Sequence, residues 1–103
     1  MKVVTVCGSM KFEKEMLEIS RDLETKHGHC VIQCVYGSHS RQETLEELEN
    51  IKNAHFKKID LSDVIYVVDI GGYIGSATQQ EIGYAISTGK QVILHSRYNG
   101  ELD

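Results

Sequence analysis

The chain lacks the long apolar segments and basic runs that mark membrane proteins and nucleic-acid-binding proteins. No apolar stretch approaches the ~18 residues that a membrane-spanning helix needs, and the N-terminus has no signal-peptide layout. Lys and Arg number 11 against 15 Asp and Glu, which gives a formal charge of −4, and no basic segment carries interleaved aromatic residues. We therefore expect a cytoplasmic protein that binds neither membranes nor nucleic acids.

Cysteine is sparse, and the odd number of copies (Cys7, Cys30 and Cys34) suits a reducing compartment better than a disulfide framework. The segment 27–39 does bring histidines close to Cys30 and Cys34. Its apolar, β-branched centre predicts a strand, in which residues four apart lie ~13 Å from one another. Two ligands of one zinc ion lie within ~4 Å. The sequence therefore predicts buried cysteines, no metal site and no cofactor.

The 103 residues predict one domain, spanning 1–103, with an ordinary globular composition of 41% hydrophobic and 25% charged residues. A chain of this length buries only about two-thirds of its unfolded surface. A deep, enclosed site is therefore hard to build from one copy, and we expect a second copy to complete it.

Strands and helices alternate along the chain. Apolar, β-branched runs predict strands at 2–7, 30–36, 64–69 and 91–95. Apolar stripes predict helices from Ser9 to about His27, from a capping box at Thr44 through Ile59, and over about 76–89. Single helices between strands imply parallel pairing with right-handed crossovers. The sequence thus predicts an α/β fold, an open parallel sheet of four to five strands with helices on both faces, and a ligand beyond the carboxyl ends of the strands.

The segment 71–85, GGYIGSATQQEIGYA, follows the third predicted strand and is the best candidate for a site. Its glycines let the backbone approach a ligand closely. Ser76 and Thr78 then place hydroxyl and N–H groups at a helix start, which favours an anion such as a phosphate. Glu81 follows one turn later. Its carboxylate either does chemistry in this site or completes a capping box with Thr78.

The motif GSATQQEIGYA, preceded by SDVIYVVD and by an N-terminal VCGSMKF, resembles the nucleoside 2-deoxyribosyltransferase-like family, which includes the deoxynucleoside 5′-monophosphate N-glycosidases. The resemblance implies a flavodoxin-like, Rossmannoid fold, a homodimer or higher homo-oligomer, and cleavage or transfer at the N-glycosidic bond of a deoxynucleoside or its monophosphate. It assigns the catalytic carboxylate to Glu81. It also assigns sugar or phosphate contacts to Gly8, Ser9, Ser76 and Thr78.

Two of the candidate site residues depart from the family pattern. Gly75 and His55 each stand at a position where family members often have an aspartate. A histidine on an apolar helical stripe is either a satisfied core residue or, where it faces the pocket, a hydrogen-bonding partner of the leaving base. Asp69 is either a sugar or base contact or a turn residue, and Tyr73 either stacks on a base or covers the sheet edge. We count all four as candidate substrate-binding residues.

Two other functions fit the same segment. GGYIGSATQQE also resembles, with extra residues, the Gly-Gly-x-Gly-Thr-x-x-Glu motif of the lysine-decarboxylase-like phosphoribohydrolases, which act on ribonucleotides. A non-catalytic nucleotide-binding module is the third possibility, and it predicts binding of a nucleotide without release of the base.

Overall fold

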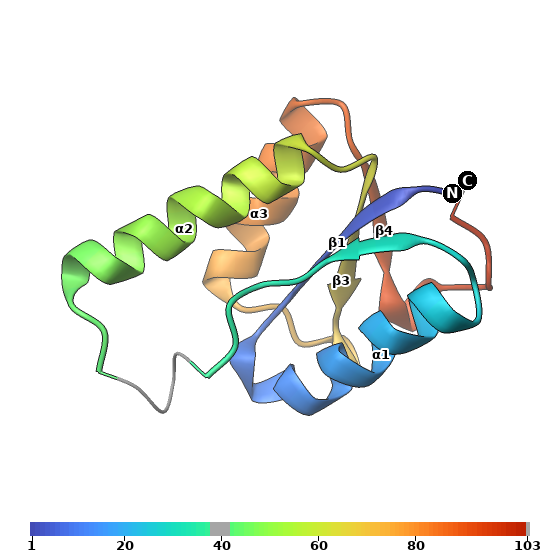
Figure 1. Cartoon of the computed structure of the whole chain (residues 1–103), viewed down its shortest axis with the longest axis horizontal. Helices are drawn as coiled ribbons and strands as arrows, with labels where there is room; N and C mark the ends of the chain where they lie inside the picture. Colours follow the sequence, from blue (N-terminus) through green and yellow to red (C-terminus); the bar gives the residue numbers. More distant parts are fainter. Residues whose placement is uncertain (38–41, 103) are drawn as a thin grey trace.

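The computed structural model describes residues 1–37 and 42–102, which form a four-stranded sheet with helices on both faces (Figure 1). All three strand pairs are parallel, and the spatial order is β2-β1-β3-β4. This is the flavodoxin-like strand order, so the predicted fold class is confirmed. The strands are β1 (Val3–Gly8), β2 (Cys30–Ile32), β3 (Val64–Val68) and β4 (Gln91–Leu94).

Two apolar clusters lie on opposite faces of the sheet and account for its continuous apolar strands. On one face, α1 (Glu13–Thr25) buries Met16 and Leu23 against alternate residues of β1 and β3. On the other face, α2 (Leu45–Asp60) and α3 (Ser76–Ser87) cover the remaining strand residues, with Ile59 and Ala85 fully buried.

The second strand is much shorter than its predicted range, 30–36. It lies at the edge of the sheet and pairs with β1 only from Cys30 to Ile32. Beyond that point side chains bind its backbone: Lys58 Nζ donates to the carbonyl of Gln33 (2.9 Å), and Gly37 N–H donates to Glu13 Oε1 (2.8 Å). The chain therefore leaves the sheet early. Part of the polar connection that follows, including His39, lies outside the described residues.

The first helix begins later than predicted, because Ser9 caps a short 3-10 helix, η1 (Met10–Phe12), with Lys11 N–H donating to its Oγ at 3.3 Å. The α-helix that follows ends at Thr25, and Gly28, at φ +69°, turns the chain toward β2. The predicted capping box at Thr44 is confirmed. Two further 3-10 helices, η3 (Ile70–Gly72) and η4 (His95–Arg97), follow β3 and β4. Across the two described ranges, every helix is too short or too polar to span a bilayer.

Candidate active site

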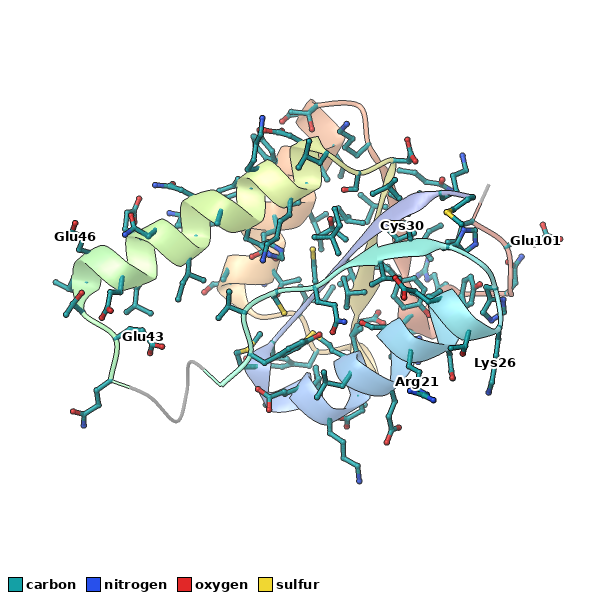
Figure 2. All side chains as sticks on the ribbon, in the orientation of Figure 1. Arg21, Lys26, Cys30, Glu43, Glu46 and Glu101 are labelled. Carbon is teal, nitrogen blue, oxygen red and sulfur yellow. The ribbon has the colours of Figure 1, made fainter. Side chains whose placement is uncertain are left out.

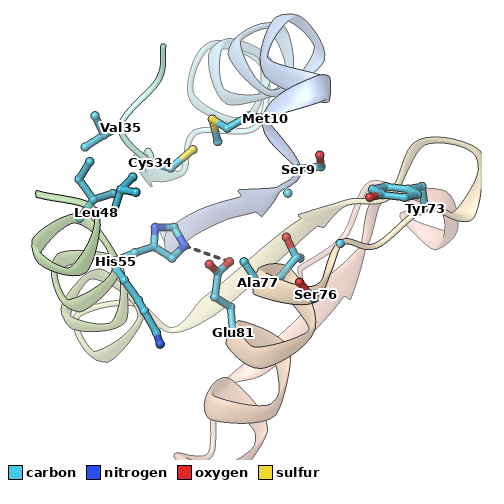
Figure 3. A pocket seen from close by; sticks show the side chains of 15 residues that line it. Ser9, Met10, Cys34, Val35, Leu48, His55, Tyr73, Ser76, Ala77 and Glu81 are labelled. Atoms are coloured by element: carbon cyan, nitrogen blue, oxygen red, sulfur yellow. Dashed lines mark ion pairs between the residues drawn. The ribbon is translucent and has the colours of Figure 1, made fainter. Parts of the chain in front are cut away.

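A cavity of about 450 Å³ opens beyond the carboxyl ends of β1 and β3 (Figure 3). This is the point of the sheet where strand order reverses, which is where ligands bind in folds of this kind. All the predicted site residues except Asp69 line it: Gly8, Ser9, His55, Tyr73, Gly75, Ser76, Thr78 and Glu81. The structure thus brings these eight residues together around one cavity.

The cavity has a polar side and an apolar side. Figure 3 shows Ser9, Ser76 and Tyr73 on one side and Cys34, Val35 and Leu48 on the other, with His55 and Glu81 between them. The apolar side comes from the segment after β2 and from α2. Its Cys34, Val35 and Leu48 were not predicted as site residues. A ligand with one polar and one flat apolar part would match this division.

Glu81 points into the cavity and pairs with a histidine from another helix. Its Oε1 lies 3.4 Å from His55 Nε2, and the two side chains are 18% and 9% exposed. The alternative interpretation of Glu81, a capping box with Thr78, is wrong. The N-cap of α3 is Gly75, and Thr78 lies inside the helix with 3% of its surface exposed. His55 proves to be both buried and directed at the cavity.

Behind this pair lies Cys7, the last side chain of β1 before the glycine that ends it. Its Sγ is 3.3 Å from His55 Nε2, and its surface is fully buried. Burial, together with the negative charge of nearby Glu81, raises the pKa of the Cys7 thiol well above its ordinary 9.0. The sequence prediction treated Cys7 as a core residue only. The sequence feature that could have identified Cys7 as a site residue is its position, directly before the Gly8-Ser9 turn at the carboxyl edge of the sheet.

Gly8 is required by packing. A Cβ at this position would lie 3.0 Å from the sulfur of Met16 and 3.2 Å from the carbonyl oxygen of Val68. A Cβ on Gly75 would meet only the Tyr73 ring, at an ordinary 3.8 Å. The close approach of α1 and β3 therefore depends on Gly8, whereas Gly75 is placed where a ligand can reach the start of α3.

Tyr73 is half-exposed at the polar side and is held in place by two neighbours. Its ring makes an edge-to-face contact with Phe12, with centroids 6.0 Å apart, and Lys11 Nζ lies 3.3 Å from its centroid. The lysine charge over the ring face is a cation–π contact. Lys11 thus contacts the face of Tyr73 and is not one of the described residues that line the cavity.

Asp69 lies outside the cavity, so its interpretation as a substrate contact is not supported by its position. The side chain is 3% exposed, and its two oxygens accept hydrogen bonds from the backbone N–H (2.8 Å) and the hydroxyl (2.7 Å) of Ser96. It therefore ties the segment after β3 to the segment after β4. The turn-residue interpretation is the one that agrees with these contacts.

No family model matches the chain, and no curated protein matches it in sequence. Among solved structures, it is similar to the CMP N-glycosidase BcmB of Clostridium botulinum, with a TM-score of 0.56 and 22% identity. The match covers 90% of this chain and 70% of that chain. The two proteins share a fold. Because one fold serves many functions, the activity of this chain has to be argued from its own site.

Proposed function

We propose that this protein cleaves or transfers at the N-glycosidic bond of a deoxynucleoside or deoxynucleoside 5′-monophosphate, with Glu81 as the nucleophile. The observation that carries the proposal is the placement of the Glu81 carboxylate inside the cavity, beside His55 and away from the cap of its own helix. The fold that the chain shares with a CMP N-glycosidase supports it.

The division of the cavity suits a nucleotide. The first turn of α3 leaves N–H groups without helical acceptors, and Ser9 and Ser76 add hydroxyls on the same side (Figure 3). This side suits a sugar and its phosphate. The apolar side, which includes Val35 and Leu48, suits a base. Glu81 lies between the two sides, where C1′ of the sugar would be.

The chemistry proceeds through an oxocarbenium-like transition state as the base departs. The Glu81 carboxylate attacks C1′ while the C1′–N bond breaks and its electron pair leaves with the base. Water or a second base then displaces Glu81 from the glycosyl-enzyme. A 2-deoxy sugar eases this route, because it lacks the electron-withdrawing hydroxyl that destabilises the cation. Among the described residues that line the cavity, Glu81 alone carries a carboxylate, so a nucleophilic role suits it better than membership of an acid–base pair.

His55 acts as a positioning residue in this proposal. Its Nε2 is directed at both Glu81 (3.4 Å) and Cys7 (3.3 Å), so this nitrogen is already engaged within the protein. A hydrogen bond from Nε2–H to Glu81 would fix the carboxylate orientation. We therefore propose that His55 orients the Glu81 carboxylate and does not contact the leaving base.

A ribonucleotide substrate is the second candidate, because the structural neighbour is named for its action on CMP. The phosphoribohydrolase alternative makes the same prediction. A substrate panel therefore has to pair each deoxynucleotide with its ribonucleotide, CMP included.

The deciding experiment measures release of free base, by chromatography, from deoxynucleosides, their 5′-monophosphates and the ribonucleotide counterparts. Glu81→Gln is compared with Glu49→Gln, a matched change at an exposed position on α2. Base release by the wild type and Glu49→Gln, but not by Glu81→Gln, is the expected result. Nucleotide binding without base release in all three proteins would replace the glycosidase with a binding module.

We also propose a homodimer or higher homo-oligomer. The N-terminal half of α2 projects away from the sheet (Figure 1), and its Leu45 is 87% exposed while Leu48 is 45% exposed beside the cavity. A second copy on this apolar surface would cover the open side of the cavity. Leu45→Asp should shift the mass measured by light scattering toward the monomer, and Ile86→Asp, at a 64% exposed position on α3, should not.

A further inference from the structure

The glycosidase proposal leaves one group of the site unused. Cys7 is a fully buried thiol in contact with the Glu81–His55 pair, and the nucleophilic mechanism gives it no step. The three side chains come from three elements, β1, α2 and α3, and converge on one point. Cys7 and His55 are buried in the body of the molecule, whereas charged side chains such as Lys26 and Glu101 lie at its surface (Figure 2).

We propose that Cys7, His55 and Glu81 form a binding site for Zn²⁺ or a similar divalent transition metal. One donor atom from each residue lies within 4.8 Å of the other two. Donor atoms bonded tetrahedrally to one zinc ion, at about 2.0–2.3 Å, lie roughly 3.3–3.8 Å apart. His55 Nε2 lies 3.3 Å from Cys7 Sγ and 3.4 Å from Glu81 Oε1, which matches this spacing.

The donor set selects for a metal of the zinc type. Thiolate and imidazole ligands favour zinc, cobalt and copper, whereas magnesium and calcium prefer oxygen alone. The charges also balance, because a Cys7 thiolate and the Glu81 carboxylate together neutralise a divalent cation in a largely buried position. A coordinated thiol is deprotonated, so binding of the ion would release the Cys7 proton to solvent.

The cavity supplies both the route to the site and its open position. His55 and Glu81 line the cavity, and Cys7 lies behind them, so an ion entering from solvent meets the imidazole and carboxylate first. Three protein ligands with a fourth position open to water or substrate are the arrangement of catalytic zinc sites. Here the ion would occupy Glu81, so metal binding and nucleophilic attack exclude one another. This last consequence rests on the proposed function; the metal site does not.

The test is a Co²⁺ titration of the whole chain, followed by its thiolate-to-metal charge-transfer absorption. The expected result is saturation at one ion per chain, displacement by Zn²⁺, loss of the band in Cys7→Ser, and its retention in Cys30→Ser and Cys34→Ser. Glu81→Gln and His55→Gln should each weaken binding by more than the 10–100-fold that loss of an outer-shell partner typically costs. These two variants carry the test if circular dichroism shows that Cys7→Ser does not fold.

Three results would overturn the proposal: no charge-transfer band in the wild type, a band that follows Cys30 or Cys34 instead of Cys7, or unchanged affinity in Glu81→Gln. The two proposals separate in the base-release assay. A protein that binds Co²⁺ as expected but releases no base in its metal-free form, prepared with a chelator, supports the metal site and refutes the glycosidase. Base release that continues with Zn²⁺ bound at saturation would refute the mutual exclusion.

Discussion

Replacement of Asp69 by alanine is expected to destabilise the protein by about 2 kcal/mol. The carboxylate is 3% exposed and accepts hydrogen bonds from the Ser96 backbone (2.8 Å) and hydroxyl (2.7 Å). A hydrogen bond to a charged group contributes about 1.5–3 kcal/mol. Because Ser96 is exposed, water can replace part of the hydrogen bonding that the variant loses. The expected loss in unfolding free energy is therefore well below the sum of two such bonds.

Urea unfolding at neutral pH measures this loss, and Ser96→Ala is the matched partner. It removes one of the two bonds and should cost about 1 kcal/mol. The double variant should cost no more than Asp69→Ala alone, because both changes delete the same hydrogen bond. Folded Asp69→Ala should release base at the wild-type rate. A stability loss below about 0.5 kcal/mol together with lost activity would show that Asp69 contacts substrate.

Three further changes test the packing. Gly8→Ala should lower the unfolding free energy by about 1–3 kcal/mol, because the added Cβ overpacks against α1 and β3. Gly83→Ala, with nothing within 4 Å of the added Cβ, should raise it by about 0.5–1 kcal/mol. Equal urea midpoints for the two variants would refute this contrast. Thr44→Ala should lower the unfolding free energy by about 1 kcal/mol through loss of its capping box, and an unchanged midpoint would contradict that box. In a thiol-reagent assay, exposed Cys30 should react at once and Cys7 only on unfolding. Because the folded Cys7 thiol keeps its proton above its ordinary pKa of 9.0, stability should fall as the pH rises past that value, and a flat profile with fast Cys7 labelling would contradict its burial.

The sequence was sufficient for the fold because its signals were periodic and local. The apolar runs of β1, β3 and β4 reflect burial on both faces of the sheet, which any arrangement of this class requires. The carboxyl ends of parallel strands share one edge, so residues that follow different strands could be grouped without knowledge of their contacts. This reasoning placed Gly8, Ser9 and Ser76 together, and the cavity contains all three.

The sequence left open, or did not reveal, which of two partners a side chain contacts. Thr78 and Glu81 have the spacing of a capping box, but α3 begins at Gly75 and the carboxylate pairs with His55 across the site. Asp69 follows β3 as a ligand contact would, but Ser96 takes both of its oxygens. The continuous apolar run that identifies β1 does not reveal that Cys7 contacts an imidazole. Tertiary contacts decide the partner in each of these cases, and residue spacing in a single sequence does not reveal such contacts.

The three side chains of the proposed metal site, Cys7, His55 and Glu81, are widely separated along the chain. His55 is 48 positions from Cys7, and α3, which carries Glu81, follows after a further strand. Contacts of such separation form late, because the closure entropy of the intervening loops has to be met before they add stability. β1 must also pair on both sides, with β2 and β3, before its end is fixed. During refolding, base release and metal binding should therefore recover only when the whole domain has folded, and never before.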